Sequence, residues 1–207
     1  MPNSKRFKSL TKRLATLRSR FLPHHFSATG VYTDYALDKA RAFRVLAHAE
    51  IEHYFEEEVT EIADKAFSLW KNQQKSSGPL VHLVCNMTGE SNGLPKKIGT
   101  ATTATSITGK AVAQYKFTIR SNHGIKSENI LQLLLPIGIS EAELDQVWLN
   151  TMDGFGVKRG QSAHTSHISH TIDPKDDYDS LFAPAGILDH IRDLDEKLYI
   201  IKKSIPK

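Results

Sequence analysis

The chain of 207 residues has a single cysteine, Cys85, and therefore cannot form an intrachain disulfide. This cysteine usage fits a reducing compartment, so we expect a cytoplasmic protein. Long apolar runs are missing as well. The longest run, residues 131–139, falls far short of the roughly 20 residues that a membrane-spanning helix needs, and it is broken by Pro136 and Gly138. We therefore expect no membrane partner.

Acidic side chains are missing from residues 1–20, although the net charge of the whole chain is only +4. The basic residues of this segment are Lys5, Arg6, Lys8, Lys12, Arg13, Arg18 and Arg20. A basic end on a nearly balanced body favours a polyanionic partner such as RNA. The apolar residues between these cations recur at helical spacing from Phe7 to Phe21 and predict an amphipathic helix. It has three interpretations: a helix packed on the body with a solvated basic face, a segment that binds the RNA backbone, or a transit peptide.

In the rest of the chain the apolar residues recur at helical spacing, and no strand pattern persists. The segments expected to be helical are 33–74, 110–120, 127–135, a helix that begins at the capping box Ser140–Glu143, and 184–203. Residues 80–87 suit either a helical turn or a buried connection, residues 88–109 a loop, and residues 173–177 a turn. The sequence therefore predicts an all-α bundle of four to five helices. We expect a basic helical extension at 1–30 and the main domain at 31–207.

Two details of the expected helices bear on the site. The long helix has an apolar stripe formed by Ile51, Phe55, Ile62, Ala66 and Leu69. His48 lies one turn before that stripe, and we interpret it as a core histidine with Glu52 as its hydrogen-bond partner. Further on, Gly154 and Gly156 interrupt the stripe of Leu144, Val147, Trp148 and Met152. We expect these glycines to end or bend the helix, so that the next segment starts afresh.

That next segment, residues 155–167, holds the side chains best suited to chemistry. Arg159 precedes His164 by five residues, and Lys158 lies beside it. Arginine is always charged and offers a planar fork of donors that fits phosphate. Histidine titrates near neutral pH and passes a proton in either direction. Together these residues can grip a phosphodiester and move a proton without a metal.

An Arg followed after about four to six residues by His resembles the signature of the HEPN superfamily. The wording Lys-Arg-Gly-Gln-Ser-Ala-His at 158–164 is similar to the RiboL-PSP-type branch of that superfamily. The stretch at 43–56 resembles the first long helix of the same branch. The resemblance covers residues 33–203 and implies a HEPN-type bundle, metal-independent endoribonuclease activity and a homodimer that brings two motifs into one cleft. It also implies a toxin–antitoxin or antiphage setting, with an antitoxin or other regulatory protein as a further partner.

The same resemblance implies a mechanism in which the RNA 2′-hydroxyl attacks the adjacent phosphorus and leaves a 2′,3′-cyclic phosphate. His164 would be the general acid or base, and Arg159 would bind the phosphate. Lys158, Ser162 and His167 are the expected substrate contacts. No cofactor is expected. His164, His167 and His170 are spaced by three, but no nearby cysteine or well-placed carboxylate completes a metal site, so none is expected.

Gly160 stands directly after the arginine, where nuclease-type members usually carry Asn, Asp or His and where this branch often has Gly. It favours an alternative, a non-catalytic HEPN module that binds RNA, a nucleotide or a protein partner; a purely structural dimerisation domain is a third interpretation. Helix geometry adds a constraint, because a separation of five residues places Arg159 and His164 roughly 140° apart. Either the backbone is irregular near Gly160, or the long Arg side chain reaches round, or a second subunit completes the site.

Overall fold

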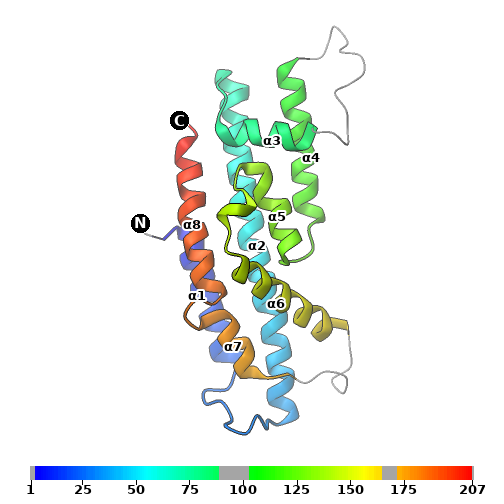
Figure 1. Cartoon of the computed structure of the whole chain (residues 1–207), viewed down its shortest axis with the longest axis vertical. Helices are drawn as coiled ribbons and strands as arrows, with labels where there is room; N and C mark the ends of the chain where they lie inside the picture. The colour runs from blue at the N-terminus through cyan, green and yellow to red at the C-terminus, as the bar shows by residue number, and fades with distance from the viewer. Residues whose placement is uncertain (1–2, 89–102, 165–171, 207) are drawn as a thin grey trace. The chain divides into compact units, whose positions relative to one another are not determined.

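The computed structural model describes residues 3–88, 103–164 and 172–206, and within them every regular element is helical (Figure 1). The α-helices are α1 (Lys5–Phe21), α2 (Asp34–Gln73), α3 (Gly78–Thr88), α4 (Ala104–Ser121), α5 (Ser127–Leu134), α6 (Gln146–His164), α7 (Pro174–Phe182) and α8 (Ile187–Ser204). Two 3-10 turns are η1 (Leu135–Ile137) and η2 (Glu141–Glu143). The all-α prediction is confirmed, and the HEPN type of the bundle stays a prediction. The predicted number of four to five helices is too low, because the described residues contain eight α-helices, α1 among them. None of the helices in the described ranges combines the length and the apolar character that crossing a bilayer requires.

The described residues belong to two compact units. Unit 1 comprises Met1–Tyr54, Gly124–Ser127 and Leu144–Glu196, and unit 2 comprises Phe55–His123, Glu128–Glu143 and Lys197–Lys207. The predicted boundary between an extension at 1–30 and a domain at 31–207 stays a prediction.

Helix α1 belongs to unit 1, and its N-cap residue, Ser4, is bonded to α8. It buries Phe7, Leu10, Leu14 and Leu17, as the helical spacing predicts. The Ser4 hydroxyl caps the helix by accepting a bond from the Phe7 amide at 3.0 Å, and the Ser4 amide donates to Asp195 of α8 at 2.8 Å. The same buried carboxylate accepts a bond from the Tyr54 hydroxyl at 2.8 Å. The prediction of a packed amphipathic helix is therefore confirmed. Its apolar face is buried, and its basic residues lie around that face.

Helix α2 begins and ends within one residue of the predicted bounds. The Thr33 hydroxyl accepts a bond from the Ala36 amide at 3.3 Å, and the helix ends before Gln74, whose φ is +56°. The predicted stripe from Ile51 to Leu69 is buried in full. Neither Gly nor Pro lies between residues 34 and 73, so the helix has no local reason to break.

Unit 2 contains more helix than the sequence predicted. Residues 78–88 form α3, so the helical alternative for 80–87 is confirmed, and α4 starts at Ala104, inside the expected loop at 88–109, rather than at 110. The Thr103 hydroxyl caps α4 by accepting a bond from the Ser106 amide at 3.2 Å, and Thr108 bonds back to the Ala104 carbonyl at 2.9 Å. These hydroxyl bonds accommodate polar residues that would otherwise favour a loop. The rest of the expected loop, residues 89–102, lies outside the described residues.

The predicted helix cap at Ser140 is wrong by five residues. The Ser140 amide and hydroxyl both bond to the Glu143 carboxylate at 2.8 Å, but the hydroxyl donates instead of capping an amide, and only the 3-10 turn η2 forms. The cap of α6 is Asp145, which accepts a bond from the Trp148 amide at 2.8 Å. With this start, Val147 is 71% exposed and does not belong to the core stripe.

A helix end at Gly154 and Gly156 with a fresh start after them is also wrong, because α6 continues through both and through Gly160, and the alternative of a bend stays a prediction. A Cβ at Gly154 or Gly160 would meet nothing within 4 Å. A Cβ at Gly156 would lie 2.8 Å from Cγ of Lys126, so this glycine permits the segment at 124–127 to lie close to the helix. Glycine costs about 1 kcal/mol in a helix interior, which packing can offset.

Residues 173–177, expected as a turn, instead open α7. Asp173 accepts a bond from the Lys175 amide at 2.9 Å, and Pro174 occupies the first helical position, where its missing N–H costs nothing. Helix α8 then starts at Ile187, three residues after the predicted start. Its apolar residues at helical spacing predict a core stripe of Ile187, Ile191, Leu194, Leu198 and Ile201, and the first four are buried whereas Ile201 is only half-buried.

Candidate functional site

The candidate site is a polar seam in unit 1 between α2, α6 and α7. We define it by Arg41, Arg44 and His48 of α2, by Lys158, Arg159 and Ser162 of α6, and by Asp176 and Asp177 of α7. On α2 the three seam residues follow spacings of three and four, and on α6 Ser162 follows Lys158 by four residues and Arg159 by three. Each helix therefore presents its seam residues on one face.

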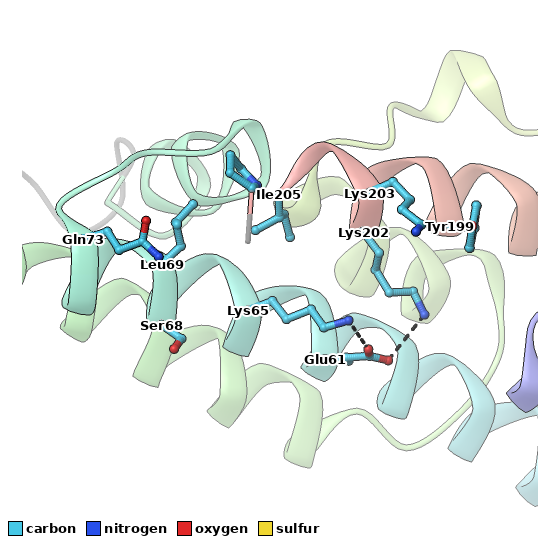
Figure 2. Close-up of a pocket in the computed structure, with 10 residues that line it drawn as sticks. Glu61, Lys65, Ser68, Leu69, Gln73, Tyr199, Lys202, Lys203 and Ile205 are labelled. Carbon is cyan, nitrogen blue, oxygen red and sulfur yellow. Dashed lines mark hydrogen bonds and ion pairs between the residues drawn. The ribbon is translucent and has the colours of Figure 1, made fainter.

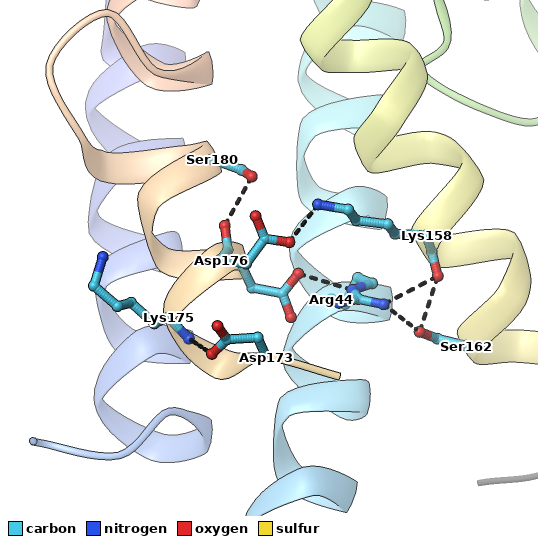
Figure 3. A network of polar contacts seen from close by, with 8 residues as sticks. Arg44, Lys158, Ser162, Asp173, Lys175, Asp176 and Ser180 are labelled. Carbon is cyan, nitrogen blue, oxygen red and sulfur yellow. Dashed lines mark hydrogen bonds and ion pairs between the residues drawn. The ribbon is translucent and has the colours of Figure 1, made fainter. Parts of the chain in front are cut away.

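Arg44 is the centre of this seam. Its Nε donates to the Asp177 carboxylate at 2.8 Å, and both side chains are buried, with exposed fractions of 4% and 0%. Its Nη1 donates to the Ser162 hydroxyl at 3.1 Å and to the Lys158 carbonyl at 3.3 Å (Figure 3). One guanidinium therefore connects α2, α6 and α7, as the fork geometry of arginine allows. Arg44 was not among the site residues predicted from the sequence. The one feature that could have indicated it is its position one helical turn before His48.

Two of the predicted substrate contacts have partners within the chain. The Ser162 hydroxyl donates to the Lys158 carbonyl at 2.9 Å and accepts the bond from Arg44. The Lys158 ammonium pairs with the Asp176 carboxylate (Figure 3). These contacts fix the orientation of α6 next to α7. A role of either residue in binding substrate stays a prediction and requires an exchange of partners.

His48 is a core histidine, as predicted, with an exposed fraction of 2% and its ring stacked on Phe155 at 6.5 Å. The expected hydrogen bond is wrong, because Nδ1 lies 3.7 Å from the Glu52 carboxylate and has no hydrogen-bond partner in the part of the chain that is described. Burial and, secondarily, the positive charge of Arg159 lower the pKa of His48 to about 4. The imidazole is therefore neutral at pH 7.

Arg159, the predicted phosphate ligand, is half-buried on the seam face of α6. Its Nε is buried and finds no hydrogen-bond partner among the described residues, and the same holds for Nε of Arg41. A buried donor without a partner costs about 1–3 kcal/mol. The seam holds four cationic side chains, and the acids that belong to it are Asp176 and Asp177. This excess of positive charge and of unused donors makes the seam suited to an anion.

Burial raises the pKa of Asp177 to about 6, and this effect exceeds the opposing hydrogen bond and charge of Arg44. One oxygen of the carboxylate, Oδ2, is also buried without a hydrogen bond in the described structure. The acid that neutralises Arg44 is therefore a group that titrates close to neutral pH.

His164 is the last residue of α6, and the helix is regular from Arg159 to that point. An irregular backbone near Gly160 is therefore excluded as the way to bring the two residues together. On a regular helix, position 164 follows Val157 by seven residues, almost two full turns, and so lies on the same side as Val157. Val157 is 46% exposed, whereas Arg159 lies on the seam face. The motif residues therefore occupy different sides of α6.

His167 and His170 lie outside the described residues, so the predicted contact of His167 and the metal interpretation of the histidine series stay untested. Within the described ranges, no cluster of three or more His, Cys, Asp and Glu side chains has the arrangement of a metal site.

No protein-family model, curated protein or solved structure matches the chain. The functional conclusion therefore depends on the chemistry of the seam and of the motif.

Proposed function

We propose that the chain is a metal-independent endoribonuclease of the HEPN superfamily, in its RiboL-PSP-like branch, acting in the cytoplasm in toxin–antitoxin or antiphage defence. The observation that carries the proposal is Arg159, whose buried Nε makes no hydrogen bond among the described residues and lies near a neutral histidine. A phosphate oxygen supplies the acceptor that this guanidinium lacks, and charge-assisted bonds to phosphate are among the stronger ones in proteins.

In this mechanism Arg159 binds the scissile phosphate and stabilises the charge that develops as the 2′-hydroxyl attacks phosphorus. As the 2′-oxygen bonds to phosphorus, the bond from phosphorus to the 5′-oxygen of the next nucleotide breaks, and that oxygen leaves as a 5′-hydroxyl. His164 either takes the proton of the 2′-hydroxyl as general base or gives a proton to the leaving 5′-oxygen as general acid, and water exchanges the other proton. His48 is neutral at neutral pH because its pKa is lowered to about 4, so it adds no positive charge to the seam that holds Arg159. Arg44 fixes α6 through the Lys158 carbonyl and the Ser162 hydroxyl, so that the guanidinium of Arg159 is held in place.

A homodimer completes the site in this proposal. The regular helix keeps Arg159 and position 164 on different sides of α6, so one chain does not bring both to one phosphate by helix geometry alone. Two motif segments that face each other across a two-fold axis would let the second copy supply the missing partner. An antitoxin or other regulatory protein would then act on this dimer.

A second candidate function is a non-catalytic HEPN module that binds RNA, a nucleotide or a protein partner. The observation that favours it is the engagement of Lys158 by Asp176 and of Ser162 by Arg44, which leaves fewer groups for a substrate. Gly160 adds to it, because it provides no polar side chain next to Arg159.

Incubation with end-labelled RNA in EDTA separates the two functions. We expect fragments that end in 2′,3′-cyclic phosphate, and we expect Arg159→Ala and His164→Ala to abolish them while the fold is retained. Arg120→Ala and His123→Ala are the matched controls, because both side chains are exposed and lie in unit 2. Full cleavage by both motif variants would refute the assignment, and RNA binding without cleavage would favour the module.

A further inference from the structure

Unit 1 contains a groove of about 510 Å³ between α1, the end of α7 and the start of α8. Its lining includes the buried side chain of Phe7, the half-buried ring of Phe182, and the basic residues Lys8, Lys12 and Arg192. The volume lies within the range of ligand-binding pockets. The groove is separate from the polar seam, since none of its lining residues belongs to that seam.

The two lysines of this groove are available to a ligand. Lys8 and Lys12 are exposed and lie one helical turn apart, on the same face of α1 as Lys5. In the described structure neither lysine has an ion pair, and residues 1–20 contain no acid. Asp189 is the acid among the lining residues, and it pairs with Arg192 at 3.1 Å. The groove therefore carries uncompensated positive charge.

A second groove, of about 610 Å³ in unit 2, shows the contrast (Figure 2). It is also lined by lysines, but Lys65 pairs with Glu61 at 2.5 Å, and Lys202 pairs with both Glu58 and Glu61. The Lys203 ammonium lies over the Tyr199 ring at 5.5 Å. The cations of this second groove have partners already, so it carries no comparable attraction for an anion.

Phe182, the partly exposed aromatic residue of the first groove, indicates a second feature of the ligand. The Phe182 ring lies 5.2 Å from the Tyr178 ring and 6.5 Å from the Phe43 ring, so its position is fixed by neighbours. The Phe182 ring is only half-buried, and Lys8 and Lys12 line the same groove. A fixed and partly exposed ring beside cations suits a nucleobase next to its phosphate. A flat anionic membrane would not reach a ring set in a hollow, so a flexible strand is the better fit.

We propose that this groove is a second RNA-binding site, which holds a single-stranded segment with its phosphates on Lys8 and Lys12 and one base against Phe182. The inference rests on the proposed function in naming RNA as the ligand, but binding in the groove requires no cleavage. This site gives the basic helix α1 a defined role. It holds one part of an RNA strand while another part of the same strand reaches Arg159 and His164.

Fluorescence anisotropy with a labelled single-stranded RNA tests the lysines, in a His164→Ala background so that the probe is not cleaved. We expect Lys8→Gln/Lys12→Gln to weaken binding roughly 10- to 30-fold near 0.1 M salt and to reduce the slope of log K against log salt by about 1.4. The matched control is Lys71→Gln/Lys75→Gln, which removes the same charge from exposed positions of unit 2. Equal weakening by both pairs would overturn the groove, because the effect would then follow net charge alone.

The aromatic contact has its own test. Phe182→Leu is expected to weaken binding of the single strand several-fold while leaving the salt slope unchanged, since a leucine loses the stacking of the base on the ring but no charge. Binding of duplex RNA, whose bases are stacked already, should not change. Phe117→Leu, at an exposed position of α4, is the control, and thermal unfolding verifies that both variants are folded. Unchanged single-strand binding in folded Phe182→Leu would overturn the base contact.

Two further outcomes separate this inference from the proposed function. If the chain cleaves RNA but the lysine pair leaves RNA binding unchanged, the groove inference is overturned and the nuclease stands. If the lysine pair weakens RNA binding and no cyclic phosphate is ever formed, the groove is supported and the nuclease is refuted. Vesicles with anionic lipid provide the last arm, and a loss of vesicle binding without a loss of RNA binding would overturn the proposal in favour of a membrane surface.

Discussion

Arg44 and Asp177 are 133 positions apart in the sequence, and they form a buried ion pair with 2.8 Å between Nε and Oδ1. The same guanidinium bonds to the Ser162 hydroxyl and to the Lys158 carbonyl, so the pair also sets the position of the helix that carries the motif. Breaking a buried pair leaves an uncompensated charge, whereas an exposed pair contributes little. The stability of unit 1 and the geometry of the motif are therefore coupled through one residue.

The first prediction concerns that pair. Arg44→Ala should lower the free energy of unfolding by about 3–5 kcal/mol, because it leaves the Asp177 carboxylate buried without its partner. Arg13→Ala, which breaks the exposed pair with Glu50, should cost about 0–1 kcal/mol. Urea denaturation measures both. The double variant Arg44→Met/Asp177→Leu should recover much of the loss, and a double variant as unstable as Arg44→Ala would show that the charge is not the cause.

The second prediction concerns the pH dependence of Asp177, whose pKa is raised to about 6 by burial. Between about pH 4 and pH 6 the folded protein holds this proton while the unfolded chain has released it, so rising pH lowers the free energy of unfolding. The side chain in Asp177→Asn does not titrate, so this variant lacks the pH-dependent contribution of residue 177 to the free energy of unfolding. The stability of the unmodified protein relative to Asp177→Asn should therefore fall from pH 4 to pH 6, by on the order of 2 kcal/mol. A relative stability that rises with pH would mean that Arg44 dominates and lowers the pKa.

The third prediction concerns His48, whose pKa is lowered to about 4 by burial and by Arg159. The unfolded chain binds this proton below about pH 6.5 and the folded protein only near pH 4, so this contribution to stability is present above pH 6.5 and is lost as the pH falls. Arg159→Gln removes one cause and should raise the pKa of His48, although burial should keep it below 6.5. Titration of the ring by NMR measures it, with Arg120→Gln as the control. An unchanged pKa in Arg159→Gln would show that the guanidinium does not act on His48.

The parts of this fold that sequence reasoning predicted are those with a strong local pattern. The stripes of α1, α2 and α8 are buried almost residue for residue, because a repeat of three and four is sufficient to mark the inner face of a helix. The burial of His48 followed from the same repeat. The composition of residues 1–20 likewise predicted the basic helix, but not the groove that α1 forms with α7 and α8.

The errors occurred where a local signal had two outcomes and tertiary contacts decided between them. Gly156 suggested a helix break, but the close approach of Lys126 uses the missing Cβ and the helix continues. Ser140 and Glu143 fit a capping box, but their side chains bond to each other and close a 3-10 turn. The pair of Arg44 and Asp177 had no local signal, because spacing along the chain does not show a contact between distant segments.

The last prediction concerns the dimer that the proposed site requires. Because α6 is regular, Arg159 and position 164 are about 140° apart on one chain, and we expect each active centre to take Arg159 from one subunit and His164 from the other. A mixture of Arg159→Ala and His164→Ala, both inactive alone, should then regain roughly a quarter of the activity, since half of the randomly paired dimers would hold one intact pair. The control is Arg120→Ala mixed with His164→Ala. Its hybrid dimers should also keep one intact pair of Arg159 and His164.

Mass action adds an independent measurement to the same prediction. Activity per chain should fall on dilution below the dimer dissociation constant, in step with the mass found by light scattering. If both copies of each residue are required, mixing rescues nothing, and the dilution series then decides alone. A monomer that cleaves RNA at full rate at every dilution would refute the composite site. The flexible Arg159 side chain would then have to reach round α6 to the same phosphate as His164. Its position in this structure, in which Nε has no hydrogen-bond partner among the described residues, would be that of the substrate-free protein.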